Sequence, residues 1–287
     1  MKTLGIIGLG AMGHPIAAHL IRNGFELYTT VRSQKSRDKA NALGIHVLES
    51  RRDFAAHTDR ILLLVSNYAQ CTECLLGDDG VFSTFHKGSV ILSSTVSPKD
   101  AEALAALCPD NVALIDAPVS GGAIGAEKGN LITITAGDSD AIDNCRDVLD
   151  CYCRKVVQVG NKAGQAQAVK AVNQMLVGIH MTATAEAMAL STAMGIDPQA
   201  MFETISDCSG TSNIFQSRMP KLIAGDFSAR ASLETLEKDT RICMDLAETY
   251  GVPSYLTNIC HDLFVQTPRD SAVSEDACAV IRMYEGK

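Results

Sequence analysis

The sequence has no long block of lysine and arginine residues, and its overall charge is negative. Its 287 residues include 25 Lys or Arg and 33 Asp or Glu, which gives a formal net charge of −8. Proteins that follow a phosphate backbone or an anionic bilayer usually carry clustered basic side chains. The composition therefore argues against nucleic acid and anionic membranes as partners and favours a small-molecule ligand.

The sequence also lacks a segment typical of a membrane anchor or a leader. The most apolar stretch, residues 175–194, is interrupted by polar side chains and is too polar for a transmembrane helix. Near the first residue, LGIIGLGAMG is too short and too rich in glycine for the apolar part of a signal peptide. We therefore expect a cytoplasmic protein that does not bind membranes.

The ten cysteines form no clear disulfide or metal-binding pattern. In a cytoplasmic protein we expect them to be reduced thiols. Cys71 and Cys74 have the spacing of a metal-ligand pair, but no second pair or histidine cluster follows them. Because cysteine is also common on the buried side of a helix, we predict no metal site.

Up to about residue 160, the sequence alternates short β-rich runs with amphipathic stretches. Helix signals agree, since Gly24 is expected to end the first helix and Ser97-Pro98 to begin a later one. This pattern predicts an α/β fold with a Rossmann-type, doubly wound and largely parallel sheet. The predicted strands are TLGIIG, ELYTTV, RILLLV, SVILSS, VALIDA, LITITA and KVVQVG.

After residue 160 the strand signals disappear, and the periodicity becomes helical, beginning with a long helix over residues 164–194. We predict a dinucleotide-binding domain at 1–162 and an all-α domain for substrate binding and oligomerisation at 163–287. Lys170 and Glu186 are the only formally charged side chains of the long helix. A helix this apolar is expected to be surrounded by others, so we expect a homodimer or homotetramer.

A glycine-rich motif joins the first predicted strand to the first predicted helix. It reads Gly8-Leu9-Gly10-Ala11-Met12-Gly13 and lies within a strand-helix-strand unit of ordinary length. At such a junction glycine permits a tight turn and close approach of a pyrophosphate to the free N–H groups of the helix. The motif predicts a bound dinucleotide; the alternative is a glycine-rich turn without a ligand.

The segment after the second predicted strand, YTTVRSQKSR, contains no acid. In NAD-dependent enzymes an acid here binds the ribose 2′-OH and repels a 2′-phosphate. Val31 takes that place, and Arg32 and Ser33 follow, with Lys35 and Arg37 further on. We therefore predict NADP, with NAD as the alternative, although these basic residues also suit an ordinary exposed helix start.

Other candidate residues follow strands at the same edge of the predicted sheet, where ligands of this fold lie. Ser66 and Asn67 follow one strand, and Thr95 follows the next. Ser120-Gly121-Gly122 offers a hydroxyl and backbone N–H groups that are not hindered by side chains, which would suit a substrate carboxylate. A flexible turn is the alternative interpretation.

The long helix carries polar groups on one face: relative to Lys170, Gln167 lies three positions before, and Asn173 and Gln174 lie three and four positions after. A charged amine in such an apolar helix is costly unless it meets a cleft or a partner. We predict that Lys170 exchanges a proton with a substrate oxygen while hydride moves at carbon, and that an adjacent amide aligns the reacting groups. The alternative is a lysine that extends to the surface.

Taken together, these motifs resemble the β-hydroxyacid dehydrogenases, whose members include 3-hydroxyisobutyrate dehydrogenases and tartronate semialdehyde reductases. The resemblance covers nearly the whole chain, and a narrower one points to the L-threonate dehydrogenases. The family motifs are GLGAMGHPIA, SSTVSP, DAPVSGGAIGAEKGNL, AGQAQAVKAVNQ and LEKD. The narrower likeness rests on LLVSNYAQ, LVGIHMTATAEAMAL, SNIFQSRMPKLIAGDF and EDACAVI.

The resemblance implies a role for each matching residue. Lys170 would be the catalytic acid-base with Asn173 or Gln174 beside it, and Thr95 would line the nicotinamide site. Ser120-Gly121-Gly122 would bind the substrate carboxylate, and Lys238 would reach the cofactor.

Three residues depart from the family pattern. Ala166 replaces a glycine in the lysine motif, Gln174 stands where many members have Asn, and Val31 replaces the Asp of similar NAD-dependent enzymes. The first two affect the expected shape of the pocket, and the third argues against NAD.

The sequence therefore predicts an NAD(P)-dependent dehydrogenase of small hydroxy acids, of the sugar-acid type. Alternatives in the same class are a 3-hydroxyisobutyrate dehydrogenase and a reductase of tartronate or succinic semialdehyde. A non-catalytic dinucleotide sensor would need the glycine loop but not Lys170, and an imine-reducing relative would be expected to carry another proton donor there.

Overall fold

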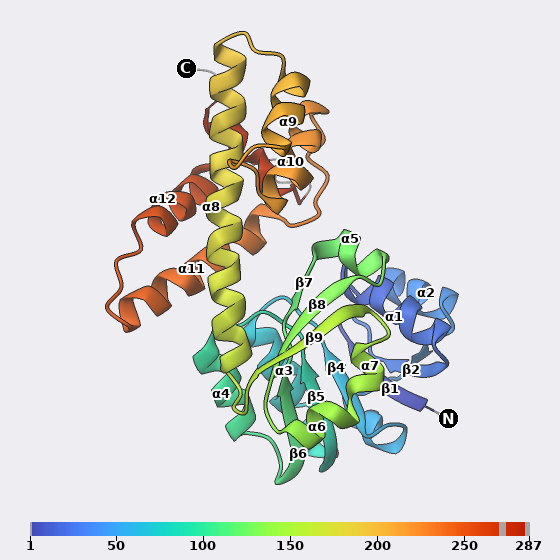
Figure 1. Cartoon of the computed structure of the whole chain (residues 1–287). Helices are drawn as coiled ribbons and strands as arrows, with labels where there is room; N and C mark the ends of the chain where they lie inside the picture. Colours follow the sequence, from blue (N-terminus) through green and yellow to red (C-terminus); the bar gives the residue numbers. More distant parts are fainter. Residues whose placement is uncertain (1, 270–273, 285–287) are drawn as a thin grey trace. The chain divides into compact units, whose positions relative to one another are not determined.

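A computed structural model describes residues 2–269 and 274–284 of the chain (Figure 1). It contains two compact units, Met1–Lys170 and Ala171–Lys287. The first is an α/β unit and the second is helical, so the predicted fold class is confirmed. The domain boundary after residue 162 stays a prediction; the two units meet inside one long helix.

The first unit is built on one sheet with the strand order β3-β2-β1-β4-β5-β6-β8-β7, and β9 pairs with β8. The six strands from β3 to β6 are parallel. All seven predicted strands are present. The strands are β1 (Lys2–Ile7), β2 (Phe25–Thr29), β3 (His46–Val47), β4 (Arg60–Leu63), β5 (Lys87–Leu92), β6 (Asn111–Asp116), β7 (Val119–Ser120), β8 (Leu131–Ala136) and β9 (Cys153–Gly160).

The sheet becomes mixed at one edge. β8 runs antiparallel to β6 and β7, and β9 runs parallel to β8. β3 and β7 were not predicted, because a two-residue strand has no periodicity to detect. β7 ends at Ser120, one of the predicted site residues, and its register pairs Ser120 with Ile132.

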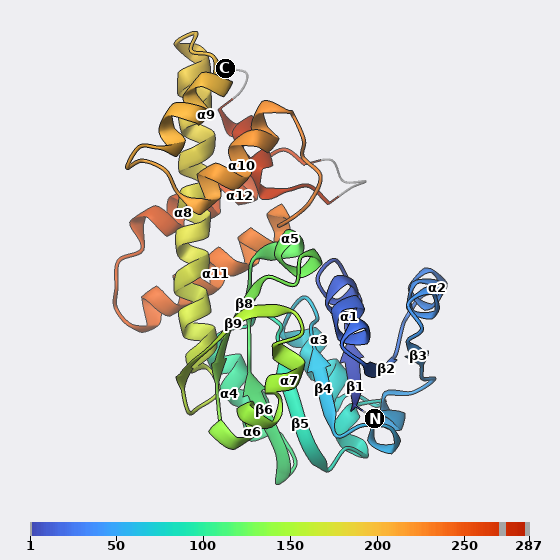
Figure 2. The same cartoon turned by 45° about the vertical axis from the view of Figure 1, so that its right-hand side comes forward.

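Helices cover both faces of this sheet, as doubly winding requires (Figure 2). One buried cluster joins the sheet to α1, α2, α5, α6 and α7, and the other joins it to η1, α3, η2 and α4. The helices are α1 (Gly13–Arg22), α2 (Gln34–Ala42), η1 (Arg51–Ala56), α3 (Tyr68–Leu76), η2 (Val81–Ser83), α4 (Pro98–Ala106), α5 (Gly122–Glu127), α6 (Ser139–Asn144) and α7 (Arg146–Leu149).

The predicted helix signals are present. Gly24 has φ +82° and donates its N–H to Ile21, which ends α1. Ser97 accepts a hydrogen bond from Asp100 N at 3.1 Å in a capping box, with Pro98 at the first helical position of α4. Both use local chemistry that is independent of the rest of the fold.

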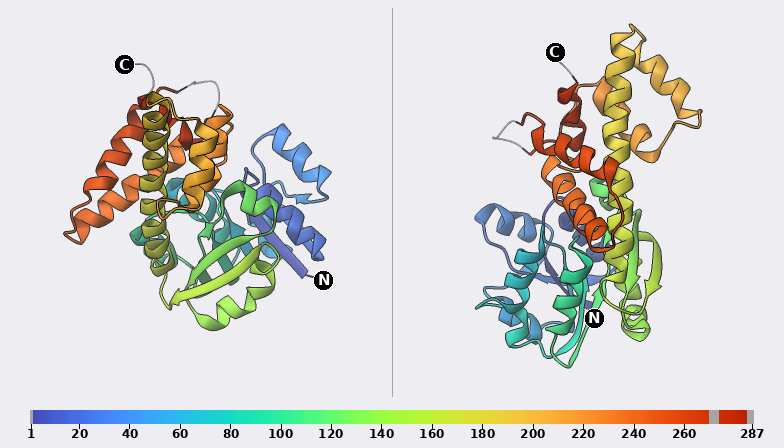
Figure 3. Two further views of the ribbon diagram at one scale, coloured as in Figure 1. Left: turned by 45° about the horizontal axis from the view of Figure 1, so that its top comes forward. Right: turned by 90° about the vertical axis from the view of Figure 1, so that its left-hand side faces the viewer.

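The long predicted helix is α8 (Gln165–Ala193), and it supplies the second unit with its first element (Figure 3). Met181 and Ala185 of α8 lie in one buried cluster with side chains of α10, α11, α12 and η3. The other elements of this unit are α9 (Pro198–Ser206), α10 (Asn213–Ile223), α11 (Leu233–Thr249), α12 (Tyr255–Gln266) and η3 (Ala277–Met283).

Several large apolar side chains of α8 are nevertheless exposed, among them Val172 at 59%, Leu176 at 50% and Leu190 at 60%. Apolar exposure of this extent on one helix is typical of an interaction surface. Within the described ranges, no helix combines the length and the hydropathy needed to cross a membrane.

Candidate active site

The three glycines of the first loop have different structural roles. Gly8 has φ +109°, and a Cβ there would lie 2.0 Å from Leu64 O. A Cβ on Gly13 would lie 1.8 Å from Gly8 O. Gly8 and Gly13 therefore permit close packing of backbone against backbone, as expected for this turn.

Gly10 lies on the open side of the loop, where a Cβ would find no atom within 4 Å. Met12, at the N-cap of α1, makes no side-chain capping hydrogen bond. The positive end of a ten-residue helix is thus open beside a residue without a side chain. This arrangement fits a dinucleotide pyrophosphate, with Leu9 and Ala11 completing the loop.

Val31, Arg32 and Ser33 follow β2 and precede α2, so they lie at the carboxyl edge of the sheet as predicted. Ser33 is the N-cap of α2 and accepts a hydrogen bond from Ser36 N at 3.2 Å. Arg32 is exposed, whereas Arg37 pairs with Glu49 at 3.1 Å. Arg32 is therefore a better candidate than Arg37 for contact with a 2′-phosphate.

Ser66 and Asn67 lie between β4 and α3. Asn67 is the N-cap of α3, and its Oδ1 accepts a hydrogen bond from Gln70 N at 3.0 Å. The Gln70 side chain in turn accepts one from Ser66 N at 3.1 Å. Asn67 thus has a structural role at the helix start, and its role toward a cofactor stays a prediction.

Thr95 follows β5 in a segment that is held by buried hydrogen bonds on both sides. Ser94 Oγ accepts from Val65 N at 2.8 Å, and Ser93 Oγ donates to Ala117 O at 3.0 Å. Thr95 itself is half-buried. These contacts bring the ends of β4, β5 and β6 together around Thr95, so this edge of the sheet is well ordered for a ligand.

Ser120 ends β7, and Gly121 and Gly122 form the start of α5. Both glycines have positive φ, +129° and +60°. A Cβ on Gly121 would also lie 2.9 Å from Leu131 Cδ2. The loop therefore needs glycine for its backbone conformation as well as for any open approach to its N–H groups.

Lys170 lies in the second turn of α8 and is only 6% exposed. Gln167, one turn earlier, is completely buried and contacts the sheet. Its Nε2 donates to Asp116 Oδ1 at 2.9 Å and to Ser94 O at 3.0 Å, and its Oε1 accepts from Val96 N at 3.2 Å. Gln167, which the sequence places on the polar face of this helix, therefore has its amide fully bonded inside the first unit.

Asp116, at the end of β6, was not predicted from the sequence. It is completely buried, and its Oδ2 accepts hydrogen bonds from Gly164 N at 2.8 Å, Ala166 N at 3.1 Å and Gln167 N at 3.2 Å. It caps the start of α8 from a distant part of the chain. A buried acid at the end of a strand, within a motif already noticed, was the available signal.

Burial raises the pKa of Asp116 to about 6, and the hydrogen bonds from Gln167, Gly164 and Ala166 limit that rise. Desolvation opposes the charged form, whereas N–H donors favour it. The position at the positive end of α8 also favours a carboxylate. Asp116 is thus a carboxyl group whose charge is stabilised almost entirely by backbone and amide dipoles.

The predicted residues of the second unit form a network of their own. Asn173 Nδ2 donates to Gln174 Oε1 at 2.9 Å, and Gln174 Nε2 donates to Asp239 Oδ2 at 2.5 Å. Lys238 Nζ lies 3.0 Å from Asp239 Oδ1. Asn173, Gln174 and Lys238 are therefore linked through Asp239, which was not predicted.

Two stretches that suggested the narrower likeness meet in the core of the second unit. Arg218 Nε lies 3.4 Å from Asp276 Oδ1, and Asp276 is completely buried. Asp276 Oδ2 also accepts from Arg230 N at 2.9 Å. This contact therefore gives both segments, SNIFQSRMPKLIAGDF and EDACAVI, a role in the packing of the second unit.

The described residues offer no metal centre: residues 2–269 and 274–284 contain no group of three or more His, Cys, Asp or Glu side chains that could hold an ion. Cys71 and Cys74 belong to α3 and lie on its buried side, within the cluster that packs against the sheet. Burial raises the pKa of Cys74, which keeps it a neutral thiol.

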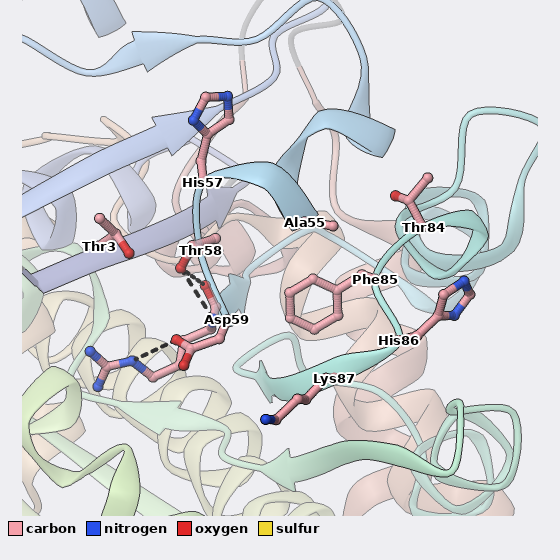
Figure 4. Close-up of a pocket in the computed structure, with 10 residues that line it drawn as sticks. Thr3, Ala55, His57, Thr58, Asp59, Thr84, Phe85, His86 and Lys87 are labelled. Carbon is pink, nitrogen blue, oxygen red and sulfur yellow. Dashed lines mark hydrogen bonds and ion pairs between the residues drawn. The ribbon is translucent and has the colours of Figure 1, made fainter.

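A hollow of about 730 Å³ lies at the opposite, amino-terminal edge of the sheet, where β1, β4 and β5 begin (Figure 4). It is wide open to solvent and is not near the predicted residues. Its polar lining side chains include His57, Asp59, His86 and Lys87.

Comparison with known proteins shows the family of the chain. Residues 3–160 match the family model described as the NAD binding domain of 6-phosphogluconate dehydrogenase. Residues 164–284 match the model described as NAD-binding of NADP-dependent 3-hydroxyisobutyrate dehydrogenase. An L-threonate dehydrogenase of Cupriavidus necator is 34% identical, over 99% of this chain and 97% of its own.

Two solved structures have the same fold. A 3-hydroxyisobutyrate dehydrogenase of Salmonella typhimurium has a TM-score of 0.90 and 31% identity, covering 99% of this chain and 100% of its own. A Mycobacterium tuberculosis 3-hydroxyisobutyrate dehydrogenase, described with L-serine, has a TM-score of 0.88 and 27% identity, with both chains fully covered.

With its glycine loop, mixed nine-stranded sheet and long helix, the chain belongs to the β-hydroxyacid dehydrogenase family. It is an enzyme of the hydroxy acid dehydrogenase class that uses a nicotinamide dinucleotide. The predicted family and enzyme class are confirmed.

Proposed function

We propose that this enzyme transfers hydride between NADP and the carbinol carbon of a small sugar acid such as L-threonate. The observation that carries the proposal is Lys170, a charged side chain that is 6% exposed on an apolar helix. The turn of α8 before it is bonded to the ligand-bearing edge of the sheet through Gln167 and Asp116. The name of the Cupriavidus relative supports the choice of substrate.

In the proposed mechanism the nicotinamide, when bound, accepts or supplies the hydride. During oxidation, Lys170 Nζ acts as the neutral amine: it takes the proton of the substrate hydroxyl and becomes the ammonium as the hydride leaves the same carbon for the nicotinamide, which turns the alcohol into a carbonyl. In the reverse direction Lys170 returns the proton to the carbonyl oxygen. Asn173, one turn along α8, holds the amine or the substrate hydroxyl in line.

Gln174 has a hydrogen bond to Asp239 and is 8% exposed, which favours an indirect role. We propose that it orients Asn173, to which it is also bonded at 2.9 Å. Lys238 would contact the cofactor while Asp239 holds its ammonium group, at 3.0 Å.

Ser120, Gly121 and Gly122 are the proposed carboxylate cradle. Positive φ values at both glycines turn the N–H groups of this loop away from the usual strand pattern. The tuberculosis relative is described with L-serine, which carries both a carboxylate and a hydroxyl. Because Gly122 has φ +60°, Ser120→Ala is a cleaner test than a bulky residue at Gly122, which would strain the backbone.

The proposed preference for NADP rests on the exposed Arg32 beside Ser33, with no acid after β2 until Asp38. Arg32→Ala should raise KM for NADP by about tenfold, the effect of losing one charge-assisted contact, and should leave KM for NAD unchanged. Arg37→Ala is the matched control, because Arg37 already pairs with Glu49. Equal effects on both cofactors would refute a contact to the 2′-phosphate.

A homo-oligomer is also proposed, because the second unit exposes apolar side chains. A hollow of about 630 Å³ is lined in part by Leu190, Met194 and Ile196, all exposed. Light scattering after size exclusion should give at least twice 30.6 kDa. A monomer at micromolar concentration would contradict this.

The decisive assay measures NAD and NADP reduction with a panel of C3 to C5 hydroxy acids, including L-threonate and 3-hydroxyisobutyrate. The reverse reaction is measured with tartronate and succinic semialdehydes. We expect the highest kcat/KM for L-threonate with NADP. Tight NADPH binding without turnover of any acid would instead support a non-catalytic sensor.

A further inference from the structure

The start of α8 depends on a carboxylate that is distant in sequence. Gly164, which precedes the helix, has no side chain to cap it, and the N–H groups of Gly164, Ala166 and Gln167 all point to Asp116 Oδ2. Most helices are capped by a neighbouring Ser, Thr, Asp or Asn. Here the cap lies 51 positions before Gln167, at the end of β6.

The partners of Gln167 fix the orientation of its side-chain amide. Its Nε2 meets two acceptors, Asp116 Oδ1 and Ser94 O, and its Oε1 meets one donor, Val96 N. Reversing the amide would place an oxygen against two acceptors and an NH₂ group against a donor. Gln167 therefore fixes the backbone on both sides of Thr95, at Ser94 and Val96, relative to the first turn of α8.

We propose that Asp116 and Gln167 are positioning residues that fix Lys170 relative to Thr95. The inference rests on the proposed function, in which Lys170 moves the proton. Lys170 follows Gln167 by three positions, so a rotation or loss of the first turn would displace its amine. A displacement of about 1 Å in a reacting group can reduce a rate by about a hundredfold.

Capping the start of α8 does not by itself require a buried acid such as Asp116 or an amide such as Gln167. A buried carboxylate is costly, and a serine at the helix start could cap it locally. In this protein the acid instead joins three elements, β6, the segment after β5 and α8, and two of them carry proposed site residues. The contact connects the proton donor to the edge of the sheet.

Isosteric substitutions test this inference. Asp116→Asn keeps one oxygen for the backbone N–H groups but sets its NH₂ against Gln167 Nε2. Gln167→Glu sets two carboxylates against each other. In the double variant Asp116→Asn with Gln167→Glu, a donor again faces an acceptor at this contact, although the bond to Ser94 O is lost.

Asp116→Asn should lower kcat by roughly ten- to a hundredfold while KM for NADP stays within about twofold, because positioning is lost and cofactor binding is not. The double variant should recover about fivefold of the activity that Gln167→Glu loses, as expected for coupled neighbours. The exposed Asp138, which caps α6 through Ala141 N at 2.9 Å, gives the matched control Asp138→Asn, with unchanged kcat.

Amide hydrogen exchange of the protein without cofactor provides a measurement that does not depend on turnover. In Asp116→Asn, a peptide over residues 163–172 should exchange about ten times faster than in the parent, since the new NH₂ group faces the donor Gln167 Nε2 and weakens the first turn of α8. Peptides over α11 should not change. If Asp116→Asn does not fold, Gln167→Asn, which keeps the amide but shortens it, takes its place.

Unchanged exchange at 163–172 would overturn the inference, and so would faster exchange with a normal kcat. Loss of activity without rescue in the double variant would also overturn it. If the parent enzyme oxidises no hydroxy acid, the proposed function fails. The exchange measurement then decides alone whether Asp116 holds the turn that carries Lys170.

Discussion

Two buried aspartates accept hydrogen bonds from glutamines of α8, and their surroundings differ. Asp116, in the first unit, accepts from Gln167 and from three backbone N–H groups. Asp239, in the second unit, accepts from Gln174 at 2.5 Å and pairs with Lys238 at 3.0 Å. Both are nearly inaccessible, with exposures of 0% and 2%.

The comparison shows two ways to hold a carboxylate in a protein interior. The donors around Asp116 belong mainly to the backbone, so they cannot move without unwinding α8. The cation beside Asp239 belongs to a side chain that is 28% exposed and can turn toward water. We therefore expect the first arrangement to be rigid and the second to adjust when a ligand binds.

Lys170, which lies between the two glutamines in sequence, should show the largest effect. Lys170→Ala should lower kcat by roughly two to four orders of magnitude and leave NADPH affinity nearly unchanged, the usual effect of losing a general acid-base group. Lys170→Arg should fail too, because guanidinium does not release its proton near neutral pH. Steady-state kinetics and NADPH fluorescence check both variants.

The control for this substitution is Lys162→Ala, which removes an exposed amine just before α8. Its kcat should match that of the parent. Near-normal turnover in Lys170→Ala would remove Lys170 from the mechanism.

Removing each aspartate tests the comparison directly. Asp116→Ala leaves several buried donors without an acceptor and should lower the free energy of unfolding by about 4 kcal/mol. Asp239→Ala removes one buried acceptor of Gln174 Nε2 and one partner of the partly exposed Lys238, so a loss of about 1–2 kcal/mol is expected. Urea denaturation of both variants measures the difference, and an equal loss would contradict the proposed rigidity of the first site.

The pKa of Asp116 predicts a pH dependence. Because burial raises this pKa from 3.8 to about 6, the folded state binds the proton more tightly than the unfolded state. The contribution to stability is therefore present below pH 4 and is lost as the pH rises through about 6. The difference corresponds to at most about 3 kcal/mol.

Denaturation between pH 5 and pH 8 should show this loss in the parent and not in Asp116→Asn, whose amide does not titrate. Identical pH profiles for the two proteins would show that Asp116 is already ionised throughout this range.

Lys238→Met should have the smallest effect on stability, less than about 1 kcal/mol, since a partly exposed ion pair contributes little. If Lys238 contacts the cofactor as proposed, KM for NADP should rise several-fold in the same variant. Lys221→Met is an unsuitable control, because Lys221 is 3% exposed and bonded to Asp226. Thermal melting and cofactor titration separate the two effects.

Local chemistry was predictable from the sequence. The seven longer strands have clear composition, and Gly24 and Ser97 carry their signals within a few residues. The capping role of Asn67 could also have been predicted, because Gln70 follows it by three positions, a known helix-start pattern.

Contacts between distant residues were not predictable in the same way. No periodicity connects Asp116 with Gln167 or Gln174 with Asp239, which are 51 and 65 positions apart. The sequence predicts a polar face on α8, but only the partners of Gln167 and Gln174 distinguish residues that anchor the helix from the proposed catalytic Lys170. A two-residue strand such as β7 likewise depends on pairing with β8.

The glycine loop has a consequence for how this sequence can diverge. Gly8 and Gly13 are required by the neighbouring backbone whether or not a nucleotide binds, since a side chain on either would collide with a carbonyl oxygen. A Cβ on Gly10 would find no atom of a non-neighbouring described residue within 4 Å, so packing does not require glycine there, whereas close approach of a dinucleotide would. A related protein that no longer binds a dinucleotide would therefore be expected to keep glycine at the positions of Gly8 and Gly13 but to accept other residues at the position of Gly10. Replacement of Gly10 alone would then indicate that the fold is kept while dinucleotide binding is lost.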